Sequence, residues 1–157
     1  MKPFLLFCKD GRALFVAVRS PNRSAAELQE LLTGTRHVYS ATAEMAARHG
    51  ETILAKCAYS QIAVVASAGS PQGLLQLRQK QDRTFILVDG LDYPSGNAKN
   101  CSYAFDRFGY GAAVCAGPSV TAAWKEEEGN DGSSYIDAAV AAALRMKKNL
   151  TRYVTIL

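Results

Sequence analysis

Three short, nearly uninterrupted apolar runs constrain the fold of this chain more than any other feature. They span residues 62–66, 84–88 and 112–116, with the sequences IAVVA, TFILV and AAVCA. A strand with one face in water would alternate apolar and polar residues, whereas continuous apolar runs are typical of strands covered on both faces. We therefore expect residues 62–66, 85–88 and 112–116 to be adjacent, mostly buried strands of one parallel sheet.

Helix signals separate these strands. Ser70 is a natural N-cap before Pro71, and proline suits the first helical position because the N–H that it lacks would be unpaired there. That helix is expected to run to about Lys80. Strands that alternate with helices at this spacing predict βαβ units with right-handed crossovers.

The first eighteen residues predict a β-hairpin. Two apolar runs, at 4–8 and 13–18, flank Asp10 and Gly11, a dipeptide that accepts the positive φ angles of a type I′ turn. Such a hairpin would add antiparallel strands to the parallel sheet.

Weaker patterns cover the rest of the chain. We expect helices over about 25–33, 43–50 and 134–148 and short strands at 37–39 and 153–157, while residues 52–58 fit a helix or a strand equally well. The predicted fold class is a single α/β domain over residues 1–157. It would be a three-layer sandwich around a mainly parallel sheet of five to seven strands, Rossmann-like or flavodoxin-like, with the N-terminal β-hairpin at its side.

The composition describes an ordinary globular chain. Its 157 residues are 48% hydrophobic and 20% charged, enough to bury a core without a metal or disulfide. A net charge of +4 is small and scattered, which argues against nucleic acid as a partner. No run approaches the roughly 18 apolar residues of a membrane span, and the four apolar residues before Cys8 are too few for a secretory leader. We expect a soluble cytoplasmic protein without a membrane partner.

The four cysteines carry no metal-site signature. They include no CxxC pair, the spacing by which zinc sites often hold two ligands in one turn. Cys8, Cys57 and Cys115 have apolar or small neighbours, so we expect small buried thiols there. Cys101 lies in the polar segment NAKNCS, two residues from Lys99, whose charge would lower the pKa of the thiol. Cys101 is therefore the candidate reactive thiol.

Small and polar residues follow each of the three expected strands. Ligands of open parallel sheets bind beyond the carboxyl ends of the strands, where helix N-termini present free N–H groups. The candidate ligand-binding residues at these exits are Ser67, Ser70, Asp89, Asp92, Lys99 and Ser119. The serines would contact an anionic, phosphorylated small molecule and Lys99 would supply a full positive charge. Asp89 and Asp92 would hold Mg²⁺ or a sugar hydroxyl.

No complete catalytic motif accompanies these residues. The phosphate-binding fingerprints GxxxxGK[ST] and GxGxxG are absent, as is the GxSxG elbow of many hydrolases. The two histidines are poor acid–base candidates, because His37 is expected at the sheet edge opposite the site and His49 in the last turn of a helix. The sequence leaves open whether the chain is an enzyme.

Two functional interpretations remain. In the first, the chain binds an anionic, phosphorylated small molecule at the strand exits. In the second, it is a noncatalytic structural subunit, and the aromatic segment 103–110 or the alanine-rich face of helix 134–148 packs against a copy of itself or another protein. Convergence on one cleft would favour the first interpretation, and it is expected of Ser70, Asp89, Asp92, Lys99 and Ser119.

Overall fold

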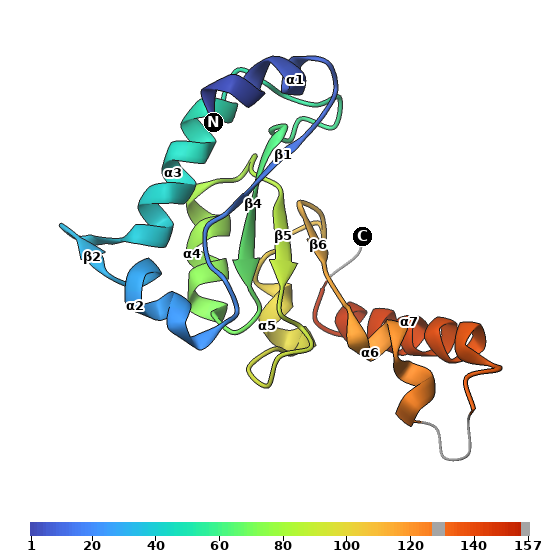
Figure 1. The fold of residues 1–157 in the computed structure, drawn as a ribbon. Coiled ribbons are helices and arrows are strands. Elements are labelled where there is room, and N and C mark those ends of the chain that lie inside the picture. Colours follow the sequence, from blue (N-terminus) through green and yellow to red (C-terminus); the bar gives the residue numbers. More distant parts are fainter. Residues whose placement is uncertain (127–130, 155–157) are drawn as a thin grey trace.

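Four parallel strands form the central sheet of the computed structural model, which describes residues 1–126 and 131–154. Their order is β1 (Leu14–Ala17), β4 (Ile62–Ser67), β5 (Ile86–Asp89) and β6 (Ala112–Val114), so spatial order follows sequence order (Figure 1). The three apolar runs are adjacent parallel strands, as predicted. Residues 112–116 are not mostly buried, however, because Ala113 and Cys115 are exposed.

Three helices cover one face of this sheet. α3 (Val38–Gly50) connects β1 to β4, α4 (Pro71–Lys80) connects β4 to β5, and α5 (Ala98–Ser102) lies between β5 and β6. Even-numbered strand residues point toward these helices and form one buried cluster with them. Its members include Ala43, Ala46, Ile62, Val64, Leu74, Leu77, Ile86, Val88, Cys101 and Ala104.

Other helices and strands complete the described chain. β2 (Leu32–Thr33) and β3 (Arg36–His37) form a separate antiparallel pair between β1 and α3. The remaining elements are η1 (Lys2–Phe4), α1 (Leu5–Lys9), η2 (Arg23–Ala25), α2 (Ala26–Gln29), α6 (Pro118–Thr121), η3 (Ala123–Glu126) and α7 (Tyr135–Thr151). Among the described residues, no helix is long and apolar enough to cross a bilayer.

The N-terminal segment differs from its predicted structure. Residues Leu5–Lys9 form helix α1, and β1 pairs in parallel with β4 rather than antiparallel with residues 4–8. Leu5 and Cys8 are three residues apart and both pack in the main core, as one side of a helix allows. Gly11 does have a positive φ, +84°, but it follows a helix instead of joining two strands. The predicted hairpin is therefore wrong.

The layer arrangement also differs. A doubly wound sheet reverses its strand order, which places helices on both faces. The order here never reverses, and α3, α4 and α5 share one face, as in a section of a (β/α)₈ barrel. The described residues therefore form two layers and a four-stranded main sheet, in place of a three-layer sandwich with five to seven strands.

The other predicted helices and strands agree in part with those of the structure. The expected helix at 134–148 is α7, whereas the helix expected at 25–33 ends at Gln29 and the strand expected at 37–39 runs into α3. Residues 52–58, which fit either period, form a loop with one isolated bridge from Leu54 to Ser60. The last expected strand, 153–157, lies partly outside the described residues.

Arg78 fixes the start of β6 relative to α4. Its side chain is buried, and its Nε donates to the Ala104 carbonyl at 2.7 Å while Nη2 donates to the Gly111 carbonyl at 2.6 Å. Because a guanidinium presents several donors in a rigid plane, one side chain satisfies carbonyls from two separate segments. This anchor positions the segment between α5 and β6, and with it the start of β6.

Candidate functional site

A cavity of about 600 Å³ opens at the carboxyl ends of β5 and β6. Apolar residues form most of its wall, among them Leu91, Cys101, Val114, Val120, Met146 and Leu150. Asp92, Ser119, Lys147 and Asn149 add polar groups, the last two from α7. A mostly apolar cavity with a few polar groups is the usual form of a small-molecule site, and typical volumes are about 300–1,000 Å³.

A smaller cavity of about 180 Å³ adjoins the first. Leu91, Asp92 and Ala116 line both cavities, so Asp92 lies where the two meet. The smaller cavity is also lined by Asp89, the last residue of β5, and by Cys115, the first residue after β6. Partial burial of the otherwise exposed Cys115 and the nearby Asp89 charge raise the pKa of its thiol, which therefore stays protonated at neutral pH.

Asp92 holds the start of helix α6. One carboxylate oxygen accepts the backbone N–H of Gly117 at 2.7 Å, and the other accepts the hydroxyl of Ser119. Partial burial works to raise the pKa of Asp92, but these hydrogen bonds outweigh it and hold the pKa below its ordinary value. Asp92 is therefore ionised at neutral pH.

This arrangement changes the expected position of a bound phosphate. The sequence interpretation placed an anion at the helix beginning near Ser119, but the Asp92 carboxylate already accepts the hydrogen bonds of that helix start. A phosphate at the same place would meet a negative charge and would lack those donors. An anionic group must therefore bind in another part of the cavity.

The candidate serines at the end of β4, Ser67 and Ser70, do not line this cavity. Ser67 pairs in register with Asp89, and its hydroxyl accepts the Gly69 N–H at 3.0 Å. Ser70 precedes α4, as expected, but it lines a separate small pocket with Arg19 and Tyr39. The structure thus brings Asp89, Asp92 and Ser119 together and leaves Ser70 on the helix-covered side.

Lys99 and Cys101 differ most from their expected roles. Lys99 is an exposed residue of α5 and lines neither the 600 Å³ nor the 180 Å³ cavity. Cys101 is fully buried, and burial raises the pKa of its thiol to about 11, opposite to the direction expected from Lys99. Cys57 and Cys115, expected as buried thiols, are exposed, whereas Cys8 is buried.

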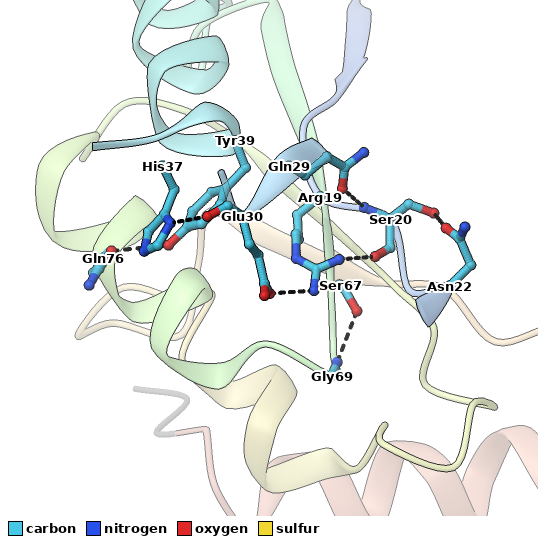
Figure 2. A network of polar contacts seen from close by, with 10 residues as sticks. All are labelled: Arg19, Ser20, Asn22, Gln29, Glu30, His37, Tyr39, Ser67, Gly69 and Gln76. Atoms are coloured by element: carbon cyan, nitrogen blue, oxygen red, sulfur yellow. Dashed lines mark hydrogen bonds and ion pairs between the residues drawn. The ribbon is translucent and has the colours of Figure 1, made fainter. Parts of the chain in front are cut away.

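A polar network surrounds the carboxyl end of β1 (Figure 2). Arg19 Nη2 lies 2.6 Å from Glu30 Oε1, and its Nη1 donates to the Ser20 carbonyl at 2.7 Å. The Ser20 N–H donates to the side-chain oxygen of Gln29 at 2.8 Å. These contacts fasten α2 and the residue after it to the end of β1, so the charge of Arg19 already has a partner.

His37 belongs to this network and not to the opposite edge of the sheet. Its Nδ1 lies 2.8 Å from the Glu30 carbonyl oxygen, and its ring stacks on Tyr39 with centroids 5.4 Å apart. Tyr39 in turn lines the pocket beside Ser67, at the carboxyl end of β4. The expected position of His37 is wrong because β3 is part of a separate small sheet.

Sequence reasoning missed Lys147. It comes from α7, about thirty residues beyond the last strand exit, and the cavity forms only because α7 packs on α5 and α6. In the sequence, Arg145, Lys147 and Lys148 have the sign that a helix C-terminus favours, which explains all three without a ligand. No local signal separates Lys147 from Lys148.

The carboxylates of Asp89 and Asp92 are not arranged as a metal-binding site. Asp89 Oδ1 accepts the Gly90 N–H at 2.7 Å, and both oxygens of Asp92 accept hydrogen bonds. Within residues 1–126 and 131–154, no group of three or more histidine, cysteine, aspartate or glutamate residues could hold a metal ion.

Curated relatives share one name. No family model matches the chain. It is 27% identical over 139 residues to orotidine 5′-phosphate decarboxylase of Caldicellulosiruptor bescii, covering 87% of this chain and 46% of that protein. It is 25% identical over 154 residues to the enzyme of the same name from Clostridium novyi, covering 97% and 53%. The chain thus spans about half the length of the curated relatives it matches.

Solved structures agree on the fold. Leishmania donovani UMP synthase matches 96% of this chain, at a TM-score of 0.71 and 20% identity, with 29% of its own chain. Leishmania donovani OMP decarboxylase matches 94% of this chain, at a TM-score of 0.67 and 20% identity, with 50% of its own chain. These matches support the mainly parallel sheet with flanking helices.

Proposed function

We propose that this chain binds a phosphorylated small molecule of nucleotide size in the 600 Å³ cavity. Orotidine 5′-phosphate, which the names of the curated relatives contain, is the probe of first choice. The observation that carries the proposal is a cavity with an apolar wall that also presents Asp92, Ser119 and Lys147 at the carboxyl edge of a parallel sheet.

Each polar group has a defined role in this proposal. Lys147 supplies the positive charge that the sequence interpretation assigned to Lys99, and it binds the phosphate. Asp92 accepts a hydrogen bond from a sugar hydroxyl, because its ionised carboxylate has more lone pairs than Gly117 and Ser119 use. Leu91 and Val120 give the base or sugar an apolar surface.

This division of roles keeps the phosphate away from Asp92. A ligand bound with both ends in the same cavity would place its anion at Lys147 on α7 and its hydroxyls at the strand exits. Because a sugar hydroxyl can lie directly on the Asp92 carboxylate, binding needs no bridging cation. We therefore expect the same affinity in Mg²⁺ and in EDTA.

Calorimetric titration with orotidine 5′-phosphate tests the proposal. Replacement of Lys147 by alanine is expected to weaken binding about tenfold to a hundredfold, the range for a lost hydrogen bond to a charged group. Lys148→Ala is the matched control, because it removes the same charge from the neighbouring, exposed position outside the cavity. Uridine, which lacks the phosphate, should bind weakly and equally to all three proteins.

Three results would contradict the proposal. They are no binding of orotidine 5′-phosphate, equal affinities for wild type and Lys147→Ala, and an equal loss in Lys147→Ala and Lys148→Ala. The last result would mean that only the net charge of α7 matters.

A further inference from the structure

A further cavity, of about 320 Å³, lies at the amino ends of β4 and β5, opposite the site described above. Ser60 and Thr84, which precede these two strands, line it together with the last residues of α3 and α4, Gly50 and Lys80. Its volume falls within the range of about 300–1,000 Å³ that small-molecule sites occupy. All of its lining residues lie between Ala47 and Thr84, so continuous, described chain forms the whole cavity.

Gln81 gives this cavity an acceptor without a donor. The residue lines the cavity and is only 8% exposed, and its Oε1 has no hydrogen-bond partner within residues 1–126 and 131–154. Buried polar atoms in folded proteins nearly always have a partner, because an unpaired one costs free energy. This oxygen therefore indicates a hydrogen-bond donor that enters the cavity.

The backbone around Gln81 is fixed by other hydrogen bonds. Its N–H donates to the Leu77 carbonyl at 3.0 Å, and its carbonyl accepts the N–H of Thr84 at 3.2 Å. Arg78 Nη1 donates to the carbonyls of Gln81 and Asp82 at 3.3 and 3.1 Å. The turn is thus held in place beside the cavity, and only the side-chain oxygen of Gln81 is left without a donor.

The charges around the cavity favour a cation. Among the described residues, Glu51 and Asp82 line it and form no ion pair, whereas Lys80 Nζ lies 3.8 Å from Glu44 Oε1. Two carboxylates and the guanidinium of Arg83 therefore remain outside ion pairs, with a net negative charge. Both α3 and α4 end at this cavity, and the negative dipole ends of helices also attract cations.

An organic cation fits this cavity better than a metal ion. The part of the chain that the structure describes holds no group of three histidine, cysteine, aspartate or glutamate residues that could bind a metal. Ala47 and Leu54 add apolar surface to the wall beside the carboxylates. An aliphatic amine matches both features, because its ammonium has three N–H donors and its methylene groups are apolar.

We propose that the 320 Å³ cavity binds a small aliphatic amine. Its ammonium donates a hydrogen bond to Gln81 Oε1 and compensates the charge of Glu51 and Asp82, while its alkyl chain packs on Leu54. The site is independent of the 600 Å³ cavity, because the two lie at opposite ends of the sheet.

Thermal unfolding in the presence of butylamine tests the proposal. The Tm of the wild type should rise with butylamine concentration, because a ligand that binds only the folded state stabilises it. Butanol, which has the same alkyl chain without the charge, and sodium chloride at the same ionic strength should give no comparable rise.

Gln81→Met is the decisive variant. It keeps the length of the side chain and removes an oxygen that is unpaired in the free protein, so the Tm in buffer should be unchanged or higher. The rise in Tm with butylamine should nevertheless be lost. Gln61→Met is the matched control, because Gln61 Oε1 is also buried and unpaired within the described chain but lies outside the cavity. It should keep the full response.

A second variant removes charge at an exposed position. Glu51→Gln should weaken the affinity for butylamine about twofold to fivefold, the range for an exposed ion pair. Glu27→Gln removes the same charge from an exposed position on α2, outside the cavity, and should leave the affinity unchanged.

Three results would overturn the proposal. They are a rise in Tm with butylamine no larger than that with butanol or sodium chloride, a full response in Gln81→Met, and an equal loss in Gln81→Met and Gln61→Met. None of them depends on whether orotidine 5′-phosphate binds.

Discussion

At the scale of single residues, Asp92 has a structural and a binding role at once. Its carboxylate accepts the hydrogen bonds of Gly117 and Ser119 at the start of α6, and it also lies where the two cavities meet. Because the first role fixes the loop after β6, a change at Asp92 should affect stability as well as affinity.

The depressed pKa of Asp92 predicts how that stability depends on pH. Its folded-state pKa is below the ordinary value of 3.8, so the ionised carboxylate stabilises the fold above pH 3.8 and this contribution is lost as pH falls through the folded-state pKa. Asp92→Asn should therefore lower the free energy of unfolding at neutral pH. The difference from wild type should shrink at acidic pH, where the wild-type side chain is neutral too.

Urea unfolding across this pH range measures the effect. Asp10→Asn is the control, because Asp10 is exposed and makes only a long surface ion pair with Arg12, at 3.8 Å. A difference between Asp92→Asn and wild type that stays constant with pH would show that the charge of Asp92 is not what stabilises α6.

The sequence identified some site residues and not others for physical reasons. Asp89 ends β5, and Asp92 and Ser119 lie within five residues of the ends of β5 and β6, so strand prediction was enough to place them at the same edge of the sheet. Lys147 reaches the cavity only through the packing of α7, which depends on contacts between distant segments. The position of Lys99 failed because α5 begins at Ala98 and turns Lys99 toward solvent.

At the scale of elements, the central position of β4 and β5 in the sheet made them predictable. Their side chains are nearly all buried or partly buried, so their sequences are apolar without interruption. Residues 4–8 are equally apolar, but Leu5–Lys9 form α1. A run this short fits a helix or a strand, and only the core contacts of Leu5 and Cys8 decide between them.

The loop between β5 and α5 should tolerate little change at Gly96. A Cβ there would lie 2.2 Å from the Gly90 carbonyl oxygen and 2.6 Å from that of Leu91, and backbone atoms cannot rotate away. We expect Gly96→Ala to cost about 1–3 kcal/mol of stability, as overpacking does, and to weaken ligand binding by shifting Asp92.

Gly34→Ala is the comparison for this loop. Gly34 has φ +66°, but a Cβ at this position would have no atom within 4 Å, so its replacement adds backbone strain of roughly 1–2 kcal/mol without a clash and far from the cavity. Ligand affinity should therefore fall in Gly96→Ala and stay unchanged in Gly34→Ala. Calorimetry and urea unfolding of the two variants distinguish these effects, and equal affinities would exclude a link between this loop and the site.

At the scale of the whole molecule, the order of strands in the sheet could not be predicted from the sequence. Alternating strands and helices have the same local pattern in a doubly wound sheet and in a barrel. The face of the sheet on which a connecting helix packs depends on which strands are neighbours. Here β1 pairs directly with β4, the next strand of the main sheet along the chain. The sequence therefore predicted the parallel sheet but not its single helical layer.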